Sequence, residues 1–135
     1  MEKKFRKRER LCSQKIIGEL FKSGNTLKQF PFKLVYSYSP RDRSPVKIVI
    51  SVPKKIHKKA VRRNFIRRRI KEAYRLNKHF VHEAVEQTTT LNIVVIYISP
   101  NIVSYAEIEK KLTKTMSILV ERIKKDVDIC TGDTD

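Results

Sequence analysis

The sequence contains no tryptophan, two cysteines and three glycines. Cys12 and Cys130 lie far apart and have no neighbouring partners at metal-ligand spacing, which excludes a disulfide framework and a cysteine-based zinc site. The chain also lacks a run of about 18 apolar residues, and no apolar signal-peptide core follows its basic beginning. These absences predict a cytoplasmic protein that is neither secreted nor membrane-spanning.

Acidic residues are scarce as well, with 14 Asp and Glu against 31 Lys and Arg and a formal net charge of +17. Such an excess predicts a polyanionic partner, and release of condensed counterions makes nucleic acid the natural one. A metal-dependent nuclease needs several converging carboxylates. Before Glu72 the only acids are Glu2, Glu9, Glu19 and Asp42. Catalysis by this chain alone is therefore disfavoured.

Two polar or basic segments also allow a weaker interpretation, as a metal site or as a membrane-binding surface. His79, His82, Glu83 and Glu86 stand at helical spacings that would allow metal binding, but a solvated helix extension explains them better. We therefore assign no metal site to the protein. An anionic membrane is a weaker partner than nucleic acid, because the basic segment lacks the broad apolar face of an interfacial helix.

The densest positive charge lies in residues 54–75, KKIHKKAVRRNFIRRRIKEAYR, where Glu72 is the single acid. At about 100° per residue the segment forms a helix with two stripes. The basic stripe contains Ala60, Asn64, Arg67, Arg68, Lys71 and Arg75, and the apolar stripe contains Ile66, Ile70, Ala73 and Tyr74. We predict a helix with a weak N-cap before Ala60 that ends near Leu76 or beyond. Its apolar side should pack on a sheet, and its basic side should bind phosphate.

Three strands are predicted, at residues 30–38, 46–52 and 91–99. The first alternates apolar and polar residues, and Pro31 confines it to a sheet edge or to the start of the ladder. The loop Ser39–Pro45 is expected to join the first two strands as a hairpin. The third strand is almost continuously apolar, which indicates a buried, central position.

Two further helices complete the pattern. The first begins near Ser13, has an apolar side of Ile16, Ile17, Leu20 and Phe21, and ends at Gly24. The last begins with the capping-box pair Ser104 and Glu107, and should end near Lys125. The order αββαβα predicts the α+β class, with helices packed on a small mixed sheet. We divide the chain into a basic arm (1–10), a single RNA-binding domain (11–125) and an acidic tail (126–135).

The basic segment also resembles a known family. In order along the chain, the residues concerned are Lys54, Lys55, Ala60, Val61, Arg63, Asn64, Ile66, Arg67 and Arg68. They resemble the Arg-Asn-Arg helix of the protein subunit of bacterial ribonuclease P. The likeness extends to LFKSG in the first helix and SVPKK after the second strand, and covers most of residues 11–125. The third position of the triplet is Phe65, so its charge would have to come from Arg62 or Arg69.

The resemblance implies a non-catalytic subunit of an endoribonuclease holoenzyme. Such a protein joins the catalytic RNA of ribonuclease P, binds precursor tRNA and assists removal of the 5′ leader, while Mg²⁺ acts through the RNA. Together, the basic stripe and the resemblance predict RNA contacts by Lys54, Lys55, Arg63, Asn64, Arg67, Arg68, Lys71 and Arg75. The resemblance further implies a leader-binding cleft, for which we expect Phe21, Phe32 and Tyr36. The alternation of apolar and polar residues alone favours a core position for Phe32 and Tyr36, and the resemblance shifts the balance towards the cleft.

The family also implies a left-handed crossover between the second and third strands, whereas the general rule is right-handed. The charge and the pattern of elements also bear on two other classes of protein. A ribosomal protein that binds rRNA would have the same charge and the same α+β pattern. A DNA-binding regulator would need a second helix immediately before the basic one, but Ser51 and Pro53 indicate a strand and its end there.

Overall fold

The computed structural model describes residues 10–11, 14–85 and 87–132, with side chains placed as far as Asp126. Its centre is a four-stranded sheet in the order β1-β2-β4-β3. The strands are β1 (Asn25–Gln29), β2 (Phe32–Pro40), β3 (Val46–Ser51) and β4 (Thr89–Tyr97). β2 pairs antiparallel with β1 and β4, whereas β3 pairs parallel with β4. The predicted α+β class with a mixed sheet is confirmed.

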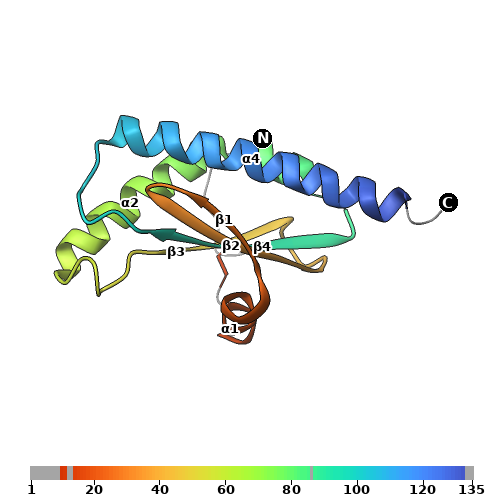
Figure 1. Cartoon of the computed structure of the whole chain (residues 1–135), viewed down its shortest axis with the longest axis horizontal. Helices are drawn as coiled ribbons and strands as arrows, with labels where there is room; N and C mark the ends of the chain where they lie inside the picture. The colour runs from red at the N-terminus through yellow and green to blue at the C-terminus, as the bar shows by residue number, and fades with distance from the viewer. Residues whose placement is uncertain (1–9, 12–13, 86, 133–135) are drawn as a thin grey trace.

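Four helices flank the sheet: α1 (Gln14–Ser23), α2 (Ala60–Asn77), α3 (His79–Ala84) and α4 (Tyr105–Gly132). α2 and α4 lie over one face, and α1 lies on the opposite face (Figure 1). The segment containing α2 and α3 connects the parallel neighbours β3 and β4, so the predicted crossover exists. Its hand stays a prediction.

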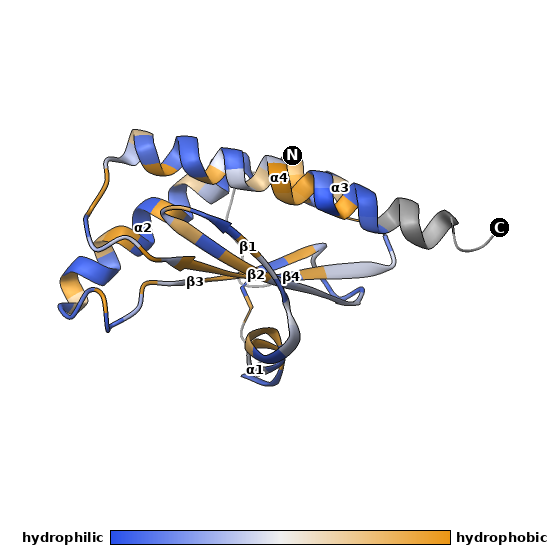
Figure 2. Cartoon of the chain, in the orientation of Figure 1, coloured by the Kyte–Doolittle hydropathy of each residue, from blue (hydrophilic) through white to orange (hydrophobic). Residues whose placement is uncertain are grey.

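The main core lies between the sheet and helices α2 and α4. From α2 it takes Ile66, Ile70, Ala73 and Tyr74, and from α4 Ile108, Leu112, Met116, Leu119 and Ile123. The apolar stripe predicted for the basic helix is therefore confirmed, and Figure 2 shows hydrophobic and hydrophilic residues alternating along both helices. At the start of α4, the hydroxyl of Ser104 accepts the amide of Glu107 at 3.3 Å, as the capping-box spacing predicted.

A smaller core lies on the other face, where Leu20 of α1 packs with Val35 and Val94 of the sheet and with Leu11. The amide of Leu11 donates to the carbonyl of Ile48 at 2.9 Å, so this segment pairs with the outer edge of β3. The rest of the predicted basic arm, residues 1–9, lies outside the described residues, as does Ser13, near which the first helix was expected to begin.

The expected hairpin between the second and third elements is wrong. β2 and β3 do not pair, because β4 lies between them. The hairpin of the sheet is instead β1-β2, whose turn contains a cis peptide bond before Pro31. Strand β1 was not predicted. Pro31 precedes β2, which agrees with its expected place at the start of a ladder, although β2 is an interior strand.

The end of α2 agrees with the expectation, whereas the end of α4 differs from it. α2 ends at Asn77 and the short α3 continues the chain, with Val81 and Val85 buried. α4 extends to Gly132, beyond the predicted end near Lys125, so residues 126–132 of the expected acidic tail are helical. The hydroxyl of Tyr38 donates to Asp126 at 2.8 Å and ties this part of α4 to β2. Among the described residues, no helix combines the length and apolarity needed to cross a bilayer.

Candidate nucleic-acid interface

The basic helix α2 follows a tight turn that starts at Pro53. The carbonyl of Pro53 accepts the amides of Ile56 and His57 at 3.1 and 3.0 Å. This turn exposes Lys54 and Lys55 to solvent. The backbone then becomes extended at Lys59, whose side chain makes no capping hydrogen bond, in agreement with the weak N-cap expected from the sequence.

His57 fixes this turn against the rest of the domain and was missed at the sequence level. Its side chain is 2% exposed, and Nε2 lies 2.7 Å from the carbonyl oxygen of Ser99. Its Nδ1 lies 3.1 Å from Nε of Arg62, which can only donate. A neutral ring with its proton on Nε2 satisfies both contacts. Because Ser99 lies 42 residues away in the chain, no local sequence pattern would have found this link.

Arg63 connects the same turn to the helix. Its Nη1 donates to the carbonyls of His57 at 3.1 Å and Lys58 at 2.8 Å, and its side chain is half-buried. Arg63 was predicted to contact RNA. The structure gives it a second task, because its guanidinium closes the backbone ahead of α2 and thereby positions the lysines of the turn.

The other predicted RNA-binding residues of α2 all lie on its solvent side. Asn64, Arg68 and Lys71 are exposed, whereas Arg67 and Arg75 are half-buried. Nη1 of Arg67 donates to Oδ1 of Asn64 at 2.8 Å, and this contact does not use the two N–H donors of the exposed Asn64 amide. The predicted basic stripe is thus a continuous surface with a hydrogen-bonding amide in its middle.

Arg75 differs from the other cations because it pairs with Glu72. The two guanidinium contacts measure 2.6 and 3.1 Å, a bidentate arrangement. The hydrogen bond from Arg75 lowers the pKa of Glu72 below its ordinary value. The single acid of residues 54–75 is therefore already neutralised, and the remaining cations of the segment have no acid of their own segment to pair with.

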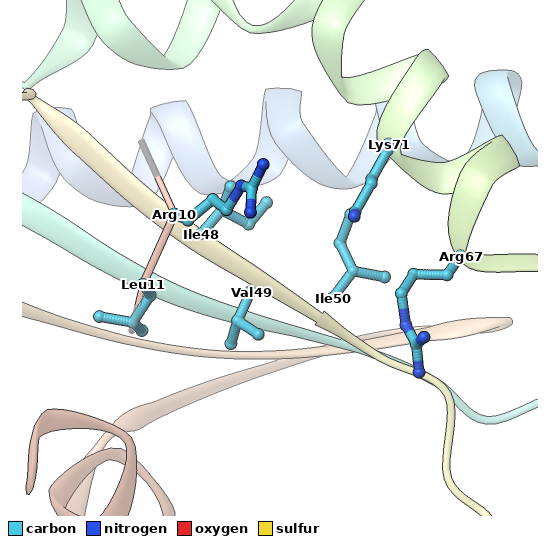
Figure 3. A pocket seen from close by; sticks show the side chains of 7 residues that line it. All are labelled: Arg10, Leu11, Ile48, Val49, Ile50, Arg67 and Lys71. Carbon is cyan, nitrogen blue, oxygen red and sulfur yellow. The ribbon is translucent and has the colours of Figure 1, made fainter. Parts of the chain in front are cut away.

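A groove of about 370 Å³ adjoins this surface where α2 passes the outer edge of β3 (Figure 3). Arg67 and Lys71 line one side, and Arg10 lies on the other. The floor consists of Leu11 and residues 48–50. From the sequence, Arg10 was expected to belong to the basic arm, and its pairing with β3 extends the cationic surface from α2 across to the sheet.

The predicted leader cleft is only partly available. Phe21 of α1 is 58% exposed, but Phe32 and Tyr36 of β2 are 0% and 3% exposed and belong to the core under α4. A base cannot stack on either ring unless α4 moves away, so the assignment of these two residues to a cleft is wrong. The strand alternates as expected, but its aromatic face is the one that the large helices cover.

The opposite face of the sheet is the open one. Next to α1, neighbouring strands place Val35, Val94 and Val49 in one row and Lys33, Ile96 and Ser51 in the next. Val49, Ile96 and Lys33 are all half-exposed. α1 covers only part of this face, and the part left uncovered is apolar with a basic margin at Lys33.

The part of the chain that the structure describes contains no group of three His, Cys, Asp or Glu side chains able to hold a metal ion. Nε2 of His82 lies 3.1 Å from the hydroxyl of Tyr74, which belongs to the main core. Glu86, one of the four residues considered for a metal site, lies outside the described residues.

Comparison with known proteins agrees with this geometry. A model of the Ribonuclease P family matches residues 5–120. The ribonuclease P protein component of Porphyromonas gingivalis is 30% identical over 112 residues, which are 82% of each chain. That of Chlorobaculum tepidum is 38% identical over 73 residues, 51% of this chain and 47% of the relative.

Solved structures show the same fold. The RNase P protein of Thermotoga maritima superposes with a TM-score of 0.62 and 25% identity, covering 81% of this chain and 96% of that one. The RNase P protein of Staphylococcus aureus superposes with a TM-score of 0.63 and is 22% identical. The match covers 84% of this chain and 96% of that one. The chain therefore belongs to the bacterial ribonuclease P protein components, subunits of the endoribonuclease that processes the 5′ end of tRNA.

Proposed function

We propose that this protein binds the catalytic RNA of ribonuclease P through the exposed side of α2 and the preceding turn, and that it helps this RNA to bind precursor tRNA. The observation that supports the proposal is the row of exposed cations on α2, in a segment whose single acid is already paired with Arg75. Such a surface is self-repelling until a polyanion covers it.

Charge neutralisation is the physical contribution that this surface would make. Two RNAs repel one another through their phosphates, and Mg²⁺ relieves the repulsion at a high ion concentration. Lys54, Lys55, Arg68 and Lys71 would take over part of that work. The catalytic Mg²⁺ would be bound by the RNA, since the described residues offer no carboxylate cluster that suits it.

The 5′ leader would lie on the open face of the sheet beside α1. Phe21 belongs to α1 and is 58% exposed, so its ring can stack on an unpaired base. Lys33, half-exposed on β2, can neutralise a leader phosphate. Phe32 and Tyr36 would contribute only indirectly, by keeping β2 packed under α4.

Reconstitution with the cognate RNA at low Mg²⁺ tests the proposal. The protein should stimulate cleavage of precursor tRNA, and the protein alone should cut nothing. Arg68→Ala and Lys71→Ala should each weaken RNA binding. For each lost phosphate contact, the slope of the logarithm of the binding constant against the logarithm of the salt concentration should become shallower by roughly 0.7 to 0.9. Cleavage by the protein without RNA would overturn the proposed division of labour, and unchanged salt dependence would remove α2 from the interface.

The leader site needs a separate experiment. Phe21→Ala should weaken binding of leader-bearing tRNA by about 1 to 3 kcal/mol and leave binding of mature tRNA unchanged. Phe80→Ala is the matched control, because Phe80 is 50% exposed but belongs to α3. Equal losses on the two substrates would show that Phe21 does not bind the leader.

A further inference from the structure

Phe65 occupies the third position of the Arg-Asn-Arg triplet, where the family pattern has an arginine. The contacts of α2 with RNA phosphates proposed above do not explain an aromatic side chain there. It lies on α2 directly before the buried Ile66, but its own side chain is 43% exposed. Val61, one turn earlier, is 82% exposed. A large apolar ring left in water within the most basic part of the chain needs a reason, because burying it elsewhere would have been favourable.

Arg69, one turn after Phe65, contacts the ring. Its Cζ lies 4.3 Å from the ring centroid, the geometry of a cation–π pair. The guanidinium therefore covers one face of the ring. Val61, Phe65 and Arg69 follow one another at four-residue intervals, so they form a ridge along α2. Because Val61 is almost fully exposed, the ring does not cover it, and the space beside the ring on that side is open.

We propose that Phe65 and Arg69 form a stacking platform for one unpaired nucleobase of the partner RNA. The base would lie on the ring face turned away from Arg69, against the methyl groups of Val61. This inference rests on the proposed function of α2 as an RNA-binding surface and adds to it a contact with a base rather than with a phosphate.

The surroundings select RNA as the occupant. Arg62 and Arg68 flank Phe65 at three-residue spacing, and Arg68 is exposed. An apolar protein surface placed here would have to desolvate these cations, whereas a nucleotide brings a phosphate to pair with them. Only an unpaired base offers a free face, because bases in a duplex are already stacked. The platform therefore favours a loop, a bulge or a single-stranded joint of the partner.

Substitutions of Phe65 separate stacking from charge. Phe65→Leu keeps an apolar side chain without the ring and should weaken binding of the cognate ribonuclease P RNA by roughly 5- to 150-fold, the loss expected for one stacked base. The salt dependence should stay unchanged, because no phosphate contact is lost. Phe65→Tyr keeps the ring and should bind like the parent. Phe65→Lys adds charge without a stacking plane, so at high salt it should bind as poorly as the leucine variant.

The controls are a surface substitution elsewhere and a fully paired RNA. Phe80→Leu, on α3, should leave affinity unchanged. An RNA duplex without loops should bind the parent and Phe65→Leu equally. Irradiation at 254 nm should crosslink Phe65 to one unpaired nucleotide of the ribonuclease P RNA, which peptide mass spectrometry would identify. Thermal unfolding of each variant shows whether the fold is intact, and the tyrosine variant preserves the test if the leucine variant unfolds.

The outcomes distinguish this inference from the function on which it rests. If Arg68→Ala flattens the salt dependence while Phe65→Leu binds like the parent, α2 binds RNA and the stacking platform is refuted. If Phe65→Lys binds better than the parent at all salt concentrations, the position serves charge, and the platform is again refuted. If neither Arg68→Ala nor Phe65→Leu changes binding, the RNA-binding role of α2 itself fails.

Discussion

Gly24, directly after α1, lies too close to its neighbours to accept a side chain. A Cβ at this position would lie 2.6 Å from the carbonyl oxygen of Leu20 and 2.7 Å from Cγ1 of Val35. The same carbonyl accepts the Gly24 amide at 2.9 Å, and Val35 is buried in the sheet, so neither can retreat unless α1 shifts. The φ angle of Gly24 is not positive, so the conformation suits any residue and the penalty is steric. Gly24→Ala should cost about 1 to 3 kcal/mol of stability.

Gly18 provides the matched control within the same helix. No atom lies within 4 Å of a Cβ built there, and the position is exposed. Alanine in the interior of a helix is favoured over glycine, because glycine loses more backbone entropy on folding. Gly18→Ala should therefore stabilise the protein by about 0.4 to 1 kcal/mol. The same glycine-to-alanine substitution at two positions six residues apart is therefore expected to change the stability in opposite directions.

Urea unfolding followed by circular dichroism measures both effects, provided that the slope with denaturant is the same for the parent and the two variants. The midpoint should fall for Gly24→Ala and rise for Gly18→Ala. Because a shift of α1 would also displace Phe21, Gly24→Ala should weaken binding of leader-bearing tRNA more than that of mature tRNA. A Gly24→Ala protein as stable as the parent would refute the proposed close packing of α1 on β2.

Three further predictions concern the core, the basic helix and the β2-β3 loop. Ile70→Asp places a charge at a position with 0% exposure and should cost several kcal/mol, seen as loss of the cooperative thermal transition; a folded variant would mean that α2 is rotated differently. Arg63→Ala should lower both RNA affinity and the unfolding midpoint, because Arg63 closes the turn before α2, whereas Arg68→Ala should lower affinity alone. Lys47 donates to Asp42 and holds the pKa of the Asp42 carboxyl below its ordinary value of 3.8. The contribution of this contact to stability is therefore present above pH 3.8 and is lost as the pH falls through the lowered pKa of the folded state. In an acid titration of stability, Asp42→Asn should converge with the parent at that lower pH.

The helices and the central strand could be predicted from the sequence because their patterns are local. Ile66, Ile70, Ala73 and Tyr74 recur at helical spacing and are all buried, and the continuous apolar run of β4 lies between two other strands. In each case the pattern that predicts the element lies within the element's own residues. The exposure of Asn64, Arg68 and Lys71 on α2 follows from the same periodicity, since a helix with one buried side exposes the other.

The order of the strands and the short strand β1 could not be predicted in this way. β1 contributes a single buried residue, Leu27, so no alternation marks it. The loop after β2 has the composition of a hairpin turn, but the strand that pairs with β2 is β4, which lies about fifty residues further along the chain. Alternation also gives two faces of β2 without saying which one the long helices cover. For Phe32 and Tyr36 the periodicity favoured the core correctly, and the expectation drawn from the resemblance was the wrong one.

His57 shows how a residue without any sequence signal can control the site. Its ring joins Arg62 on α2 to the carbonyl of Ser99 after β4 and lies 5.8 Å from the ring of Tyr97, so it holds the turn that bears Lys54 and Lys55. His57→Phe keeps an aromatic ring but leaves a buried carbonyl without its donor, which should cost about 1 to 3 kcal/mol.

His57→Ala should cost more than His57→Phe, because it adds a cavity to the lost hydrogen bonds. Thermal unfolding ranks the two variants, and filter binding then compares their RNA affinities at a temperature where both are folded. We expect both to bind more weakly than the parent, because in both the turn before α2 has lost its anchor. A phenylalanine variant with the parent's stability and affinity would show that ring packing alone positions the turn, and that its hydrogen bonds to Arg62 and Ser99 add nothing.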